Sequence, residues 1–323
     1  MRGLSFKKFG NPQSSLSFED QRQPVIKAGE VLIKMLYSPI NPSDVNQIEG
    51  VYPVMPLESN KTYYPGNEGC GQVVEVGSDV HELQKGDKVI FTSYAKGLWR
   101  EFVNASPTDV FKVNNKLDPE IAAVLSVNPC SAYRMIQDYG NNKVIIQNAA
   151  NSNVGRLVIQ LAHLQGLKTI NIVRNRPNIQ ELKTELLELG ADVVLTEDEL
   201  NMRENQSKVK EMVPTLALNA VGGPSATNIS KLLSNDGVLV TYGGMSKKPI
   251  TLPIGLLIFK NISFKGFWMT EWTRKNTLEA KRDMLSHIQS LVLDGKLKFA
   301  SQRHFELSDF NAFNKGDKAV YKF

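Results

Sequence analysis

One tyrosine of the sequence lies in a segment with the composition of a loop that lines a cleft. Tyr52 follows Gly50 and the polar segment 42–44, and glycine and proline bound the segment. Such loops often carry binding and catalytic side chains. A tyrosine hydroxyl, with an ordinary pKa of about 10, stays protonated near neutral pH and can donate a proton. Tyr52 is therefore a candidate general acid, although its spacing alone favours an aromatic side chain packed on the surface.

A second candidate is the turn that follows the predicted strand 143–149. The usual G-x-G-x-x-G sequence is mostly missing there, and only Gly155 remains. The small polar residues Asn151, Ser152 and Asn153 still permit a tight turn, and the N-terminus of the following helix offers amides and a positive dipole end. The turn is therefore a candidate pyrophosphate site. The alternative is an ordinary strand–turn–helix corner.

The next predicted strand ends in two arginines. An NAD site usually places Asp or Glu about 20 residues after the glycine turn, where it holds the ribose 2′-hydroxyl. Here Arg174 and Arg176 stand at that place, and no acidic residue accompanies them. A planar guanidinium suits a 2′-phosphate in charge and geometry. We therefore expect NADPH rather than NADH, and the alternative is a solvated basic loop.

The elements that would position these residues change in character near residue 117. The earlier part is rich in strands and turns, with predicted strands at 31–37, 71–77 and 88–91. Afterwards continuous apolar runs alternate with amphipathic runs, which is typical of buried parallel strands and covering helices. The predicted strands are 143–149, 169–174, 193–195, 216–221, 238–242, 263–268 and a last strand at 319–323, and the predicted helices are 118–139, 154–165, 179–189 and 278–293. The sequence therefore predicts an α/β fold with a doubly wound parallel sheet.

Composition limits the classes of protein that the chain can belong to. Its 323 residues exceed the roughly 250–300 at which single cores stop growing, so we expect two domains. Apolar residues make up 41% and charged residues 22%, which excludes a mainly disordered chain. No apolar run reaches the roughly 18 residues of a membrane span. The net charge of +5 is scattered and mild, so we expect neither nucleic acid nor a membrane as a partner.

Several sequence blocks together resemble the medium-chain dehydrogenase/reductase superfamily. The segments 67–77 and 85–89 resemble its N-terminal signature and the turn and strand that follow it. Within the superfamily, the chain is most similar to the zinc-free 2-enoyl thioester reductases, of the mitochondrial trans-2-enoyl-CoA/acyl-carrier-protein reductase type. The blocks that carry this resemblance are 38–44, 50–52, 127–135, 147–155, 171–177, 241–245 and 266–268.

The resemblance implies both a fold and an activity. It implies a mostly-β GroES-like catalytic domain formed by residues 1–117 and 285–323, and a Rossmann domain formed by residues 118–284. The implied activity is the NADPH-dependent reduction of trans-2-enoyl thioesters, carried on coenzyme A or acyl-carrier protein, to saturated acyl thioesters in fatty acid synthesis. The implied assembly is a homodimer that uses a sheet edge and a helix of the cofactor domain.

The resemblance also assigns residues to the site. Tyr52 matches the proton-donating tyrosine of the family. The implied cofactor residues are Asn128 near the nicotinamide, Asn151, Ser152, Asn153 and Val154 at the pyrophosphate, Arg174, Asn175 and Arg176 at the adenosine phosphate, Tyr242, Gly243, Gly244 and Met245 at the nicotinamide ribose, Phe267, Trp268 and Met269 beside the nicotinamide and the acyl channel, and Lys318 in the last strand. For Phe267 and Trp268, packing in the core is an equally good interpretation.

The resemblance implies no metal. Zinc members have a cysteine and a histidine as ligands in the N-terminal domain, together with a lobe of four cysteines. Here Asn67 stands where the ligand histidine would be, the segment 41–44 has no cysteine, and two cysteines, Cys70 and Cys130, are too few for the lobe. We expect both cysteines to be buried thiols.

Two other functions and the location of the protein stay open. A quinone oxidoreductase of the same superfamily is also zinc-free, but it usually keeps a glycine-rich turn. A non-enzymatic binding protein on this scaffold would bind NADPH without turnover, and Tyr52 speaks against it. If acyl-carrier protein docks, candidate contacts are Lys247, Lys248, Arg274 and Lys275. The N-terminus has no leader, which predicts a cytoplasmic protein, or a mitochondrial matrix protein if a leader was removed.

Overall fold

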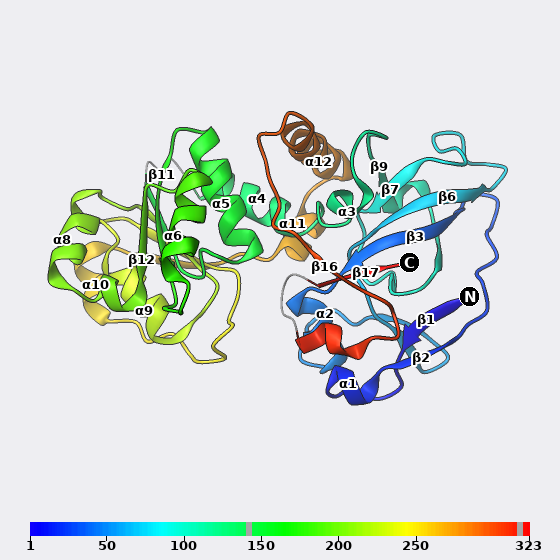
Figure 1. Ribbon diagram of the computed structural model, residues 1–323, viewed down its shortest axis with the longest axis horizontal. Helices are drawn as coiled ribbons and strands as arrows, with labels where there is room; N and C mark the ends of the chain where they lie inside the picture. The colour runs from blue at the N-terminus through cyan, green and yellow to red at the C-terminus, as the bar shows by residue number, and fades with distance from the viewer. Residues whose placement is uncertain (140–143, 315–318) are drawn as a thin grey trace. The chain divides into compact units, whose positions relative to one another are not determined.

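The computed structural model describes residues 1–139, 144–314 and 319–323, which fall into two compact units. The first, here called the β-rich unit, consists of Met1–Val127, Asn276–Gly295 and Phe299–Phe323. The second, the α/β unit, consists of Asn128–Lys275 and Lys296–Lys298. Figure 1 labels many of the elements of both.

The units divide after Val127 and Lys275, whereas the sequence predicted divisions after residues 117 and 284. One cause lies in the helix α12 (Leu278–Leu293), which packs in the β-rich unit. There the Gln289 side chain accepts a hydrogen bond from the Asn114 backbone at 2.7 Å, and Arg282 donates to the Pro107 carbonyl at 3.1 Å. The predicted helix 118–139 is in fact two helices, and only the second belongs to the α/β unit.

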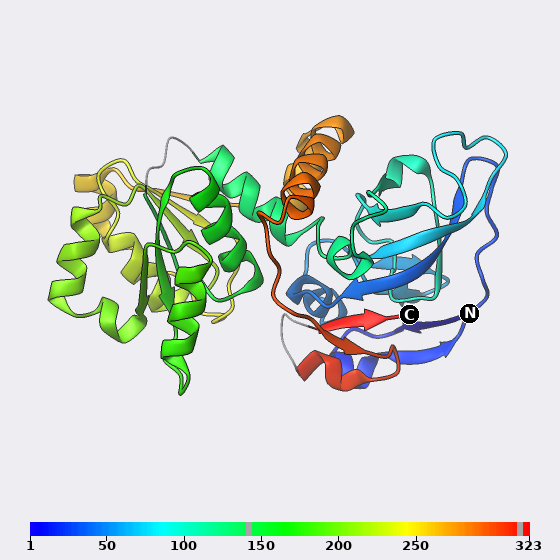
Figure 2. The same ribbon diagram turned by 45° about the horizontal axis from the view of Figure 1, so that its top comes forward.

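The β-rich unit is built around a seven-stranded sheet. Its order is β16 (Arg303–Phe305), β17 (Ala319–Lys322), β3 (Val31–Pro39), β6 (Cys70–Val76), β7 (Lys88–Phe91) and β9 (Val110–Lys112), with β8 (Phe102–Ala105) also paired to β3. Figure 2 shows β3 in blue beside β6 in cyan. The predicted strands at 31–37, 71–77, 88–91 and 319–323 are confirmed. Alternate residues of β3, Val31, Ile33 and Met35, lie in the core.

Short elements complete the β-rich unit. They are β1 (Arg2–Ser5), α1 (Pro12–Ser15), β2 (Ser17–Asp20), α2 (Pro42–Ile48), β4 (Leu57–Ser59), β5 (Thr62–Tyr64), η1 (Pro107–Asp109), α3 (Pro119–Ala122) and η2 (Phe310–Asn314). Proline at the first helical position and Asn41 before it start α2. The Asp44 carboxylate accepts a hydrogen bond from the Asn41 backbone N–H, which completes a capping box at the start of α2.

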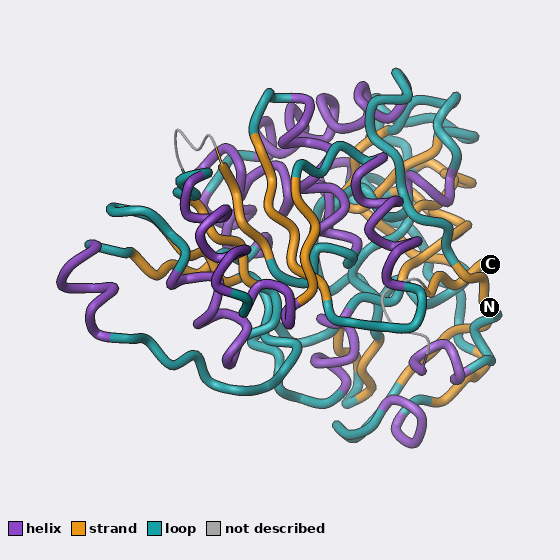
Figure 3. The backbone as a smooth tube through the Cα atoms, turned by 60° about the vertical axis from the view of Figure 1, so that its left-hand side comes forward, coloured by secondary structure: helices purple, strands orange, loops and turns teal. Residues whose placement is uncertain are grey.

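The α/β unit holds a six-stranded sheet in which every neighbouring pair is parallel. The order is β12 (Val193–Thr196), β11 (Lys168–Val173), β10 (Val144–Gln147), β13 (Leu216–Asn219), β14 (Val238–Thr241) and β15 (Ser263–Gly266). In Figure 3 these strands run side by side in orange with purple helices on both sides. The predicted doubly wound parallel sheet is confirmed.

Helices of the α/β unit cover this sheet and bury its apolar strands. They are α4 (Asn128–Asp138), α5 (Asn153–Leu164), α6 (Ile179–Glu188), α7 (Glu197–Leu200), α8 (Arg203–Glu211), α9 (Gly223–Lys231), α10 (Ile254–Lys260) and α11 (Met269–Lys275). Ile146, Ile170 and Ala217 lie side by side on three strands in one buried cluster. The strand order reverses between β10 and β13, and in open parallel sheets ligands bind at the carboxyl ends of strands at such a point.

Two smaller observations concern the chain as a whole. Cys70 and Cys130 are both buried and form no disulfide, as predicted. Among the described residues, no helix has the length and apolar character required to cross a bilayer.

Candidate functional site

The predicted cofactor residues of the α/β unit lie at one edge of the parallel sheet. Residues 151–154 follow β10, 174–176 follow β11, 242–245 follow β14 and 267–269 follow β15. Because all these strands are parallel, the four segments share the carboxyl edge of the sheet, two on each side of the reversal point. Asn128 is the first residue of α4 and is half-buried. Lys318 lies outside the described residues.

The turn after β10 is closed by hydrogen bonds rather than by glycines. Ser152 caps α5, and its hydroxyl accepts from the Gly155 backbone N–H at 3.1 Å. Its own N–H donates to the Ala149 carbonyl at 2.9 Å, while Ala149 holds a φ of 48° in the region that favours glycine. A Cβ added at Gly155 would lie 2.6 Å from the Ala150 carbonyl oxygen, so this position excludes a side chain. The helix N-terminus therefore presents its positive dipole end at the strand edge.

Two buried asparagines at the reversal point had no predicted role. The Asn148 amide donates to the Asn219 side-chain oxygen at 2.8 Å, and its own oxygen accepts from the Ala220 backbone at 2.8 Å. The Asn219 amide continues to the Thr241 hydroxyl at 3.1 Å. This row of amides joins the carboxyl ends of β10, β13 and β14 at the reversal point. A polar residue that ends an apolar strand is the sequence signal that would have found both.

The donors at this edge fit a dinucleotide that carries an extra phosphate. Arg174 is exposed and Arg176 half-buried, and the Arg176 Nε is a buried atom with no hydrogen-bond partner among the described residues. A buried guanidinium N–H without a partner is costly, and an anionic group placed there would remove the cost. Tyr242 lies in the segment 242–245, which follows β14. Burial raises the pKa of its hydroxyl, so this group stays a hydrogen-bond donor.

The segment after β15 combines packing with exposure. Met269 is buried at the start of α11, while Phe267 and Trp268 are half-buried. The Arg274 guanidinium lies 5.4 Å from the centroid of the Trp268 ring. Met245, in the segment after β14, is 66% exposed. Of these apolar side chains, Met245 is exposed at the strand edge, Phe267 and Trp268 are partly exposed, and Met269 belongs to the core.

In the β-rich unit, Tyr52 lies in the segment between α2 and β4 and is half-buried. The segment leaves α2 through Gly50, whose φ is 76° and whose added Cβ would meet the Phe9 ring at 3.0 Å. The neighbouring Tyr63 stacks on Phe6 with ring centroids 5.2 Å apart, which gives it a packing role. The structure thus places Tyr52 on a loop whose first residues are held against Phe9 at the end of α2.

Behind this loop lies a cluster of buried polar side chains, here called the Asp44–Glu68 cluster: Asn41, Asp44, Gln47, Asn67 and Glu68. Asn67 donates from its amide nitrogen to Asp44 at 2.6 Å and to Gln47 at 2.5 Å, and Asn41 donates to Glu68 at 3.0 Å. Burial raises the pKa of Asp44 to about 6 and that of Glu68 to about 7. The sequence predicted only that Asn67 and the segment 41–44 supply no zinc ligand, and the buried cluster itself had no predicted role.

The cluster does not fit a zinc ion. It contains neither cysteine nor histidine, and Asn67 turns its amide nitrogen, which is a hydrogen-bond donor, toward the carboxylate. The Glu68 carboxylate is already occupied by N–H and O–H groups of Asn41, Ser126 and Val127. Within the described ranges, no group of three metal-ligating side chains occurs.

The raised pKa of Glu68 predicts a pH dependence of stability. Because the folded chain holds the proton more tightly than the unfolded chain, this group stabilises the fold fully below pH 4.5, and that contribution is lost as the pH rises toward 7. The loss amounts to about 3 kcal/mol at most. Glu68→Gln removes the titrating group, so the melting temperature of the wild type minus that of the variant should be larger at pH 5 than at pH 8. If the melting temperatures of the wild type and the variant differ by the same amount at pH 5 and pH 8, this assignment is wrong.

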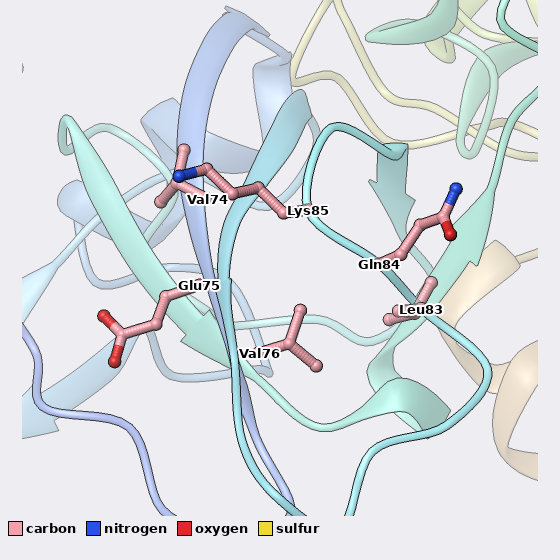
Figure 4. Close-up of a pocket in the computed structure, with 6 residues that line it drawn as sticks. All are labelled: Val74, Glu75, Val76, Leu83, Gln84 and Lys85. Atoms are coloured by element: carbon pink, nitrogen blue, oxygen red, sulfur yellow. The ribbon is translucent and has the colours of Figure 1, made fainter.

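A shallow hollow on the β-rich unit contains none of the predicted site residues. It is lined by Val74, Glu75, Val76, Leu83, Gln84 and Lys85. In Figure 4 the Glu75 carboxylate points away from Val76 and Leu83, so the space between strand and loop has an apolar lining. We assign no function to it.

Comparison with known proteins agrees with this geometry. Residues 27–115 match the family described as "Alcohol dehydrogenase GroES-like domain", and residues 153–287 match "Zinc-binding dehydrogenase". The mitochondrial enoyl-[acyl-carrier-protein] reductase of Rattus norvegicus is 39% identical over 314 residues, which cover 96% of this chain and 83% of the relative. That of Caenorhabditis elegans is 41% identical, over 92% of this chain and 86% of the relative.

Solved structures are similar over the whole chain. The mitochondrial 2-enoyl thioester reductase Etr1p/Etr2p heterodimer from Candida tropicalis has a TM-score of 0.93 and 34% identity, covering 100% of this chain and 99% of that one. The Etr1p/NADP/crotonyl-CoA complex has the same TM-score of 0.93, identity of 34% and coverage of 100% and 99%.

Proposed function

The chain belongs to the family of mitochondrial enoyl-[acyl-carrier-protein] reductases within the medium-chain dehydrogenase/reductase superfamily, and from this premise we propose which of its residues perform the reaction. The activity is the NADPH-dependent reduction of trans-2-enoyl thioesters to saturated acyl thioesters. The fold agrees with it, since a GroES-like unit and a Rossmann-type parallel-sheet unit are the two parts of such reductases.

In the proposed mechanism, the strand edge of the α/β unit binds NADPH, which supplies the hydride when bound. The N-terminus of α5, with Asn151, Ser152, Asn153 and Val154, would hold the pyrophosphate, and Arg174, Asn175 and Arg176 the 2′-phosphate. Asn128 and the segments 242–245 and 267–269 would border the nicotinamide and its ribose. The partnerless Arg176 Nε is the observation that carries this assignment.

Tyr52 would supply the proton. Reduction of the double bond leaves negative charge on the thioester enolate, and the α-carbon of that enolate must be protonated. Tyr52 stands on a loop that backbone hydrogen bonds tie to α2, and a phenol O–H is a group that can donate a proton. The proton on the α-carbon would therefore come from the Tyr52 oxygen.

One assay tests the activity against the quinone alternative. NADPH oxidation is measured with crotonyl, 2-hexenoyl and longer enoyl thioesters, each on coenzyme A and on acyl-carrier protein, and with 1,2-naphthoquinone. We expect kcat/KM for the enoyl thioesters to exceed that for the quinone by orders of magnitude. Turnover of the quinone alone would contradict the proposal, and NADPH binding without any turnover would indicate a non-enzymatic protein.

The physiological carrier in our proposal is acyl-carrier protein, which is acidic. The net charge of +5 supports it, and so do the exposed side chains of Lys247 and Lys248. Arg274 and Lys275 are also exposed, and both pair with Glu271, at 3.7 and 3.3 Å. The relatives are named as mitochondrial enzymes, which supports the mitochondrial matrix rather than the cytoplasm as the place of action.

The assembly in our proposal is a homodimer formed by the α/β unit. β15 stands at one end of the sheet order, so one of its edges has no strand beside it among the described residues of the unit. The adjoining α10 exposes Ile254 at 70%, Ile258 at 65% and Phe259 at 80%. A bare strand edge next to exposed apolar side chains is suited to pairing with a second copy of the same surface.

The double substitution Ile258→Asp, Phe259→Asp tests the dimer. It places two like charges on the apolar surface of α10, so the variant should elute as a monomer in size-exclusion chromatography with light scattering, whereas the wild type elutes as a dimer. Both side chains are exposed within the unit, so the melting temperature should fall only by what is lost with the dimer. A dimeric variant would place the interface elsewhere.

A further inference from the structure

We propose that Gln47 is a positioning residue, which holds the loop of Tyr52 in place through a hydrogen bond whose direction is set by Asn67. The inference rests on the proposed role of Tyr52 as the proton donor. It gives a function to the Asp44–Glu68 cluster, which stands where the resemblance places a metal ligand in the zinc members of the superfamily.

The loop is tied to α2 on both sides of Tyr52. Before it, the Gly50 N–H donates to the Gln47 carbonyl at 3.1 Å, and the Val51 N–H donates to the Asn46 carbonyl at 3.0 Å. After it, the Gln47 side chain donates from Nε2 to the Val54 carbonyl at 2.9 Å. The bonds before Tyr52 are backbone bonds that many sequences would form. The bond after it needs a side chain with an N–H at this position.

The partners of Gln47 fix which end of its amide faces the loop. The Gln47 Oε1 accepts from the Asn67 Nδ2 at 2.5 Å, so its Nε2 must face Val54. Asn67 is itself oriented, because its Oδ1 accepts from the Ala95 backbone N–H at 3.1 Å. Its Nδ2 therefore points at Gln47 and at the Asp44 carboxylate, 2.6 Å away. The direction of each bond thus derives from a backbone N–H.

Burial makes this chain of bonds stiff. Gln47 is 2% exposed, Asn67 is 7% exposed and Asp44 is fully buried. A second backbone donor, the Asn41 N–H, holds the other Asp44 oxygen at 2.8 Å. Inside a protein, such bonds strengthen because the local dielectric is low, and a broken member leaves a buried group unpaired. The cluster therefore holds the Val54 backbone in one place rather than merely filling space.

The test variant is Gln47→Met, which keeps the length of the side chain and removes its N–H. Loss of the bond to Val54 frees one end of the loop, and a shift of about 1 Å in a reacting group can cost roughly 10²-fold in rate. We expect kcat for crotonyl thioester reduction to fall by 10- to 100-fold. The KM for NADPH should stay unchanged, because the proposed cofactor residues belong to the α/β unit. The solvent deuterium isotope effect on kcat should rise, since proton transfer becomes slower.

A matched control and a conservative variant separate positioning from stability. Gln160 is a buried glutamine of the α/β unit, which bonds both ways with the Lys298 backbone at 2.9 and 2.7 Å. Gln160→Met should lower the melting temperature and leave kcat and the isotope effect unchanged. In Gln47→Glu, a protonated carboxyl can again donate to Val54, so kcat relative to wild type should recover as the pH falls. Asp44 faces the same Asn67 amide, and Glu68 lies in the same cluster, so the new carboxyl titrates together with them and the recovery of kcat follows the titration of the group as a whole.

The variant Tyr52→Phe distinguishes the two levels of the proposal. If Tyr52→Phe loses activity and Gln47→Met adds nothing further in that background, the positioning role is supported. If Tyr52→Phe loses activity but Gln47→Met behaves like Gln160→Met, the positioning role is wrong and the proton donor stands. If Tyr52→Phe keeps the wild-type kcat, the proton-donor role fails and the inference fails with it.

Discussion

Replacing Tyr52 with phenylalanine should lower kcat for the reduction of crotonyl thioesters by roughly 10²- to 10⁴-fold, the range for losing a general acid. The substitution removes one oxygen from a half-buried ring, so packing of the loop against α2 is retained. The dissociation constant for NADPH should be unchanged, because the proposed cofactor residues lie at the strand edge of the α/β unit. Steady-state assays together with fluorescence titration of NADPH measure both quantities.

Tyr63→Phe is the control for this experiment. Tyr63 lies in the same unit and is also a tyrosine, but its ring stacks on Phe6, with centroids 5.2 Å apart, and packs at a tilt against Phe9, with centroids 4.9 Å apart. Since packing needs the ring and not the hydroxyl, the control should keep kcat near the wild-type value. A Tyr52→Phe variant that binds NADPH normally and turns over at the wild-type rate would remove Tyr52 from the mechanism.

The double substitution Arg174→Ala, Arg176→Ala should raise the KM for NADPH by about 10²-fold or more and leave the KM for NADH nearly unchanged. A hydrogen bond to a charged group contributes about 1.5–3 kcal/mol, so two lost guanidinium contacts account for a change of that size. NADH has no 2′-phosphate and loses nothing. The ratio of kcat/KM values for the two cofactors is the quantity to measure.

Arg203→Ala is the matched control for the arginine pair. Arg203 is an exposed arginine at the start of α8, in the same unit but outside the strand-end segments. Its removal changes the net charge of the unit without removing a proposed contact, so both cofactors should be used as before. An equal loss of NADPH and NADH use in the double variant would show that the arginines support the fold and do not select the cofactor.

Much of the α/β unit was predictable because its signals are local. The central buried strands are short apolar runs that end in one polar residue, such as Val144–Gln147 and Leu216–Asn219, and a turn and a helix follow each of these two. The strand ends therefore identify the edge at which a ligand binds, even though only Gly155 of the glycine pattern remains. The Ser152 cap and the left-handed Ala149 replace those glycines.

The borders of the units were less predictable, because they depend on contacts between distant parts of the chain. The helix α12 follows the main segment of the α/β unit in sequence, but it forms hydrogen bonds with Asn114 and Pro107 of the β-rich unit. The periodicity of α12 predicts a helix and does not say which unit the helix packs against. For the same reason, the sequence predicted one helix over 118–139, whereas the structure has two helices there, α3 and α4.

The polar clusters were the least predictable feature of the site. The bond from Asn41 to Glu68 spans 27 positions of sequence, and that from Asn148 to Asn219 spans 71. No local pattern links such pairs, and each asparagine alone suggests a turn. What the sequence does contain is the unusual polar residue at the end of an apolar run, which predicts a buried hydrogen bond without identifying its partner.

The most direct test of the central claim is a crystal structure of the chain with NADP⁺ and an enoyl thioester bound. The account predicts the Tyr52 hydroxyl within hydrogen-bonding reach of the reacting end of the thioester, on the side from which the α-carbon would be protonated, with Val54 still bonded to Gln47. A Tyr52 hydroxyl turned into bulk solvent with both ligands in place, or a transition metal coordinated beside the substrate, would contradict it.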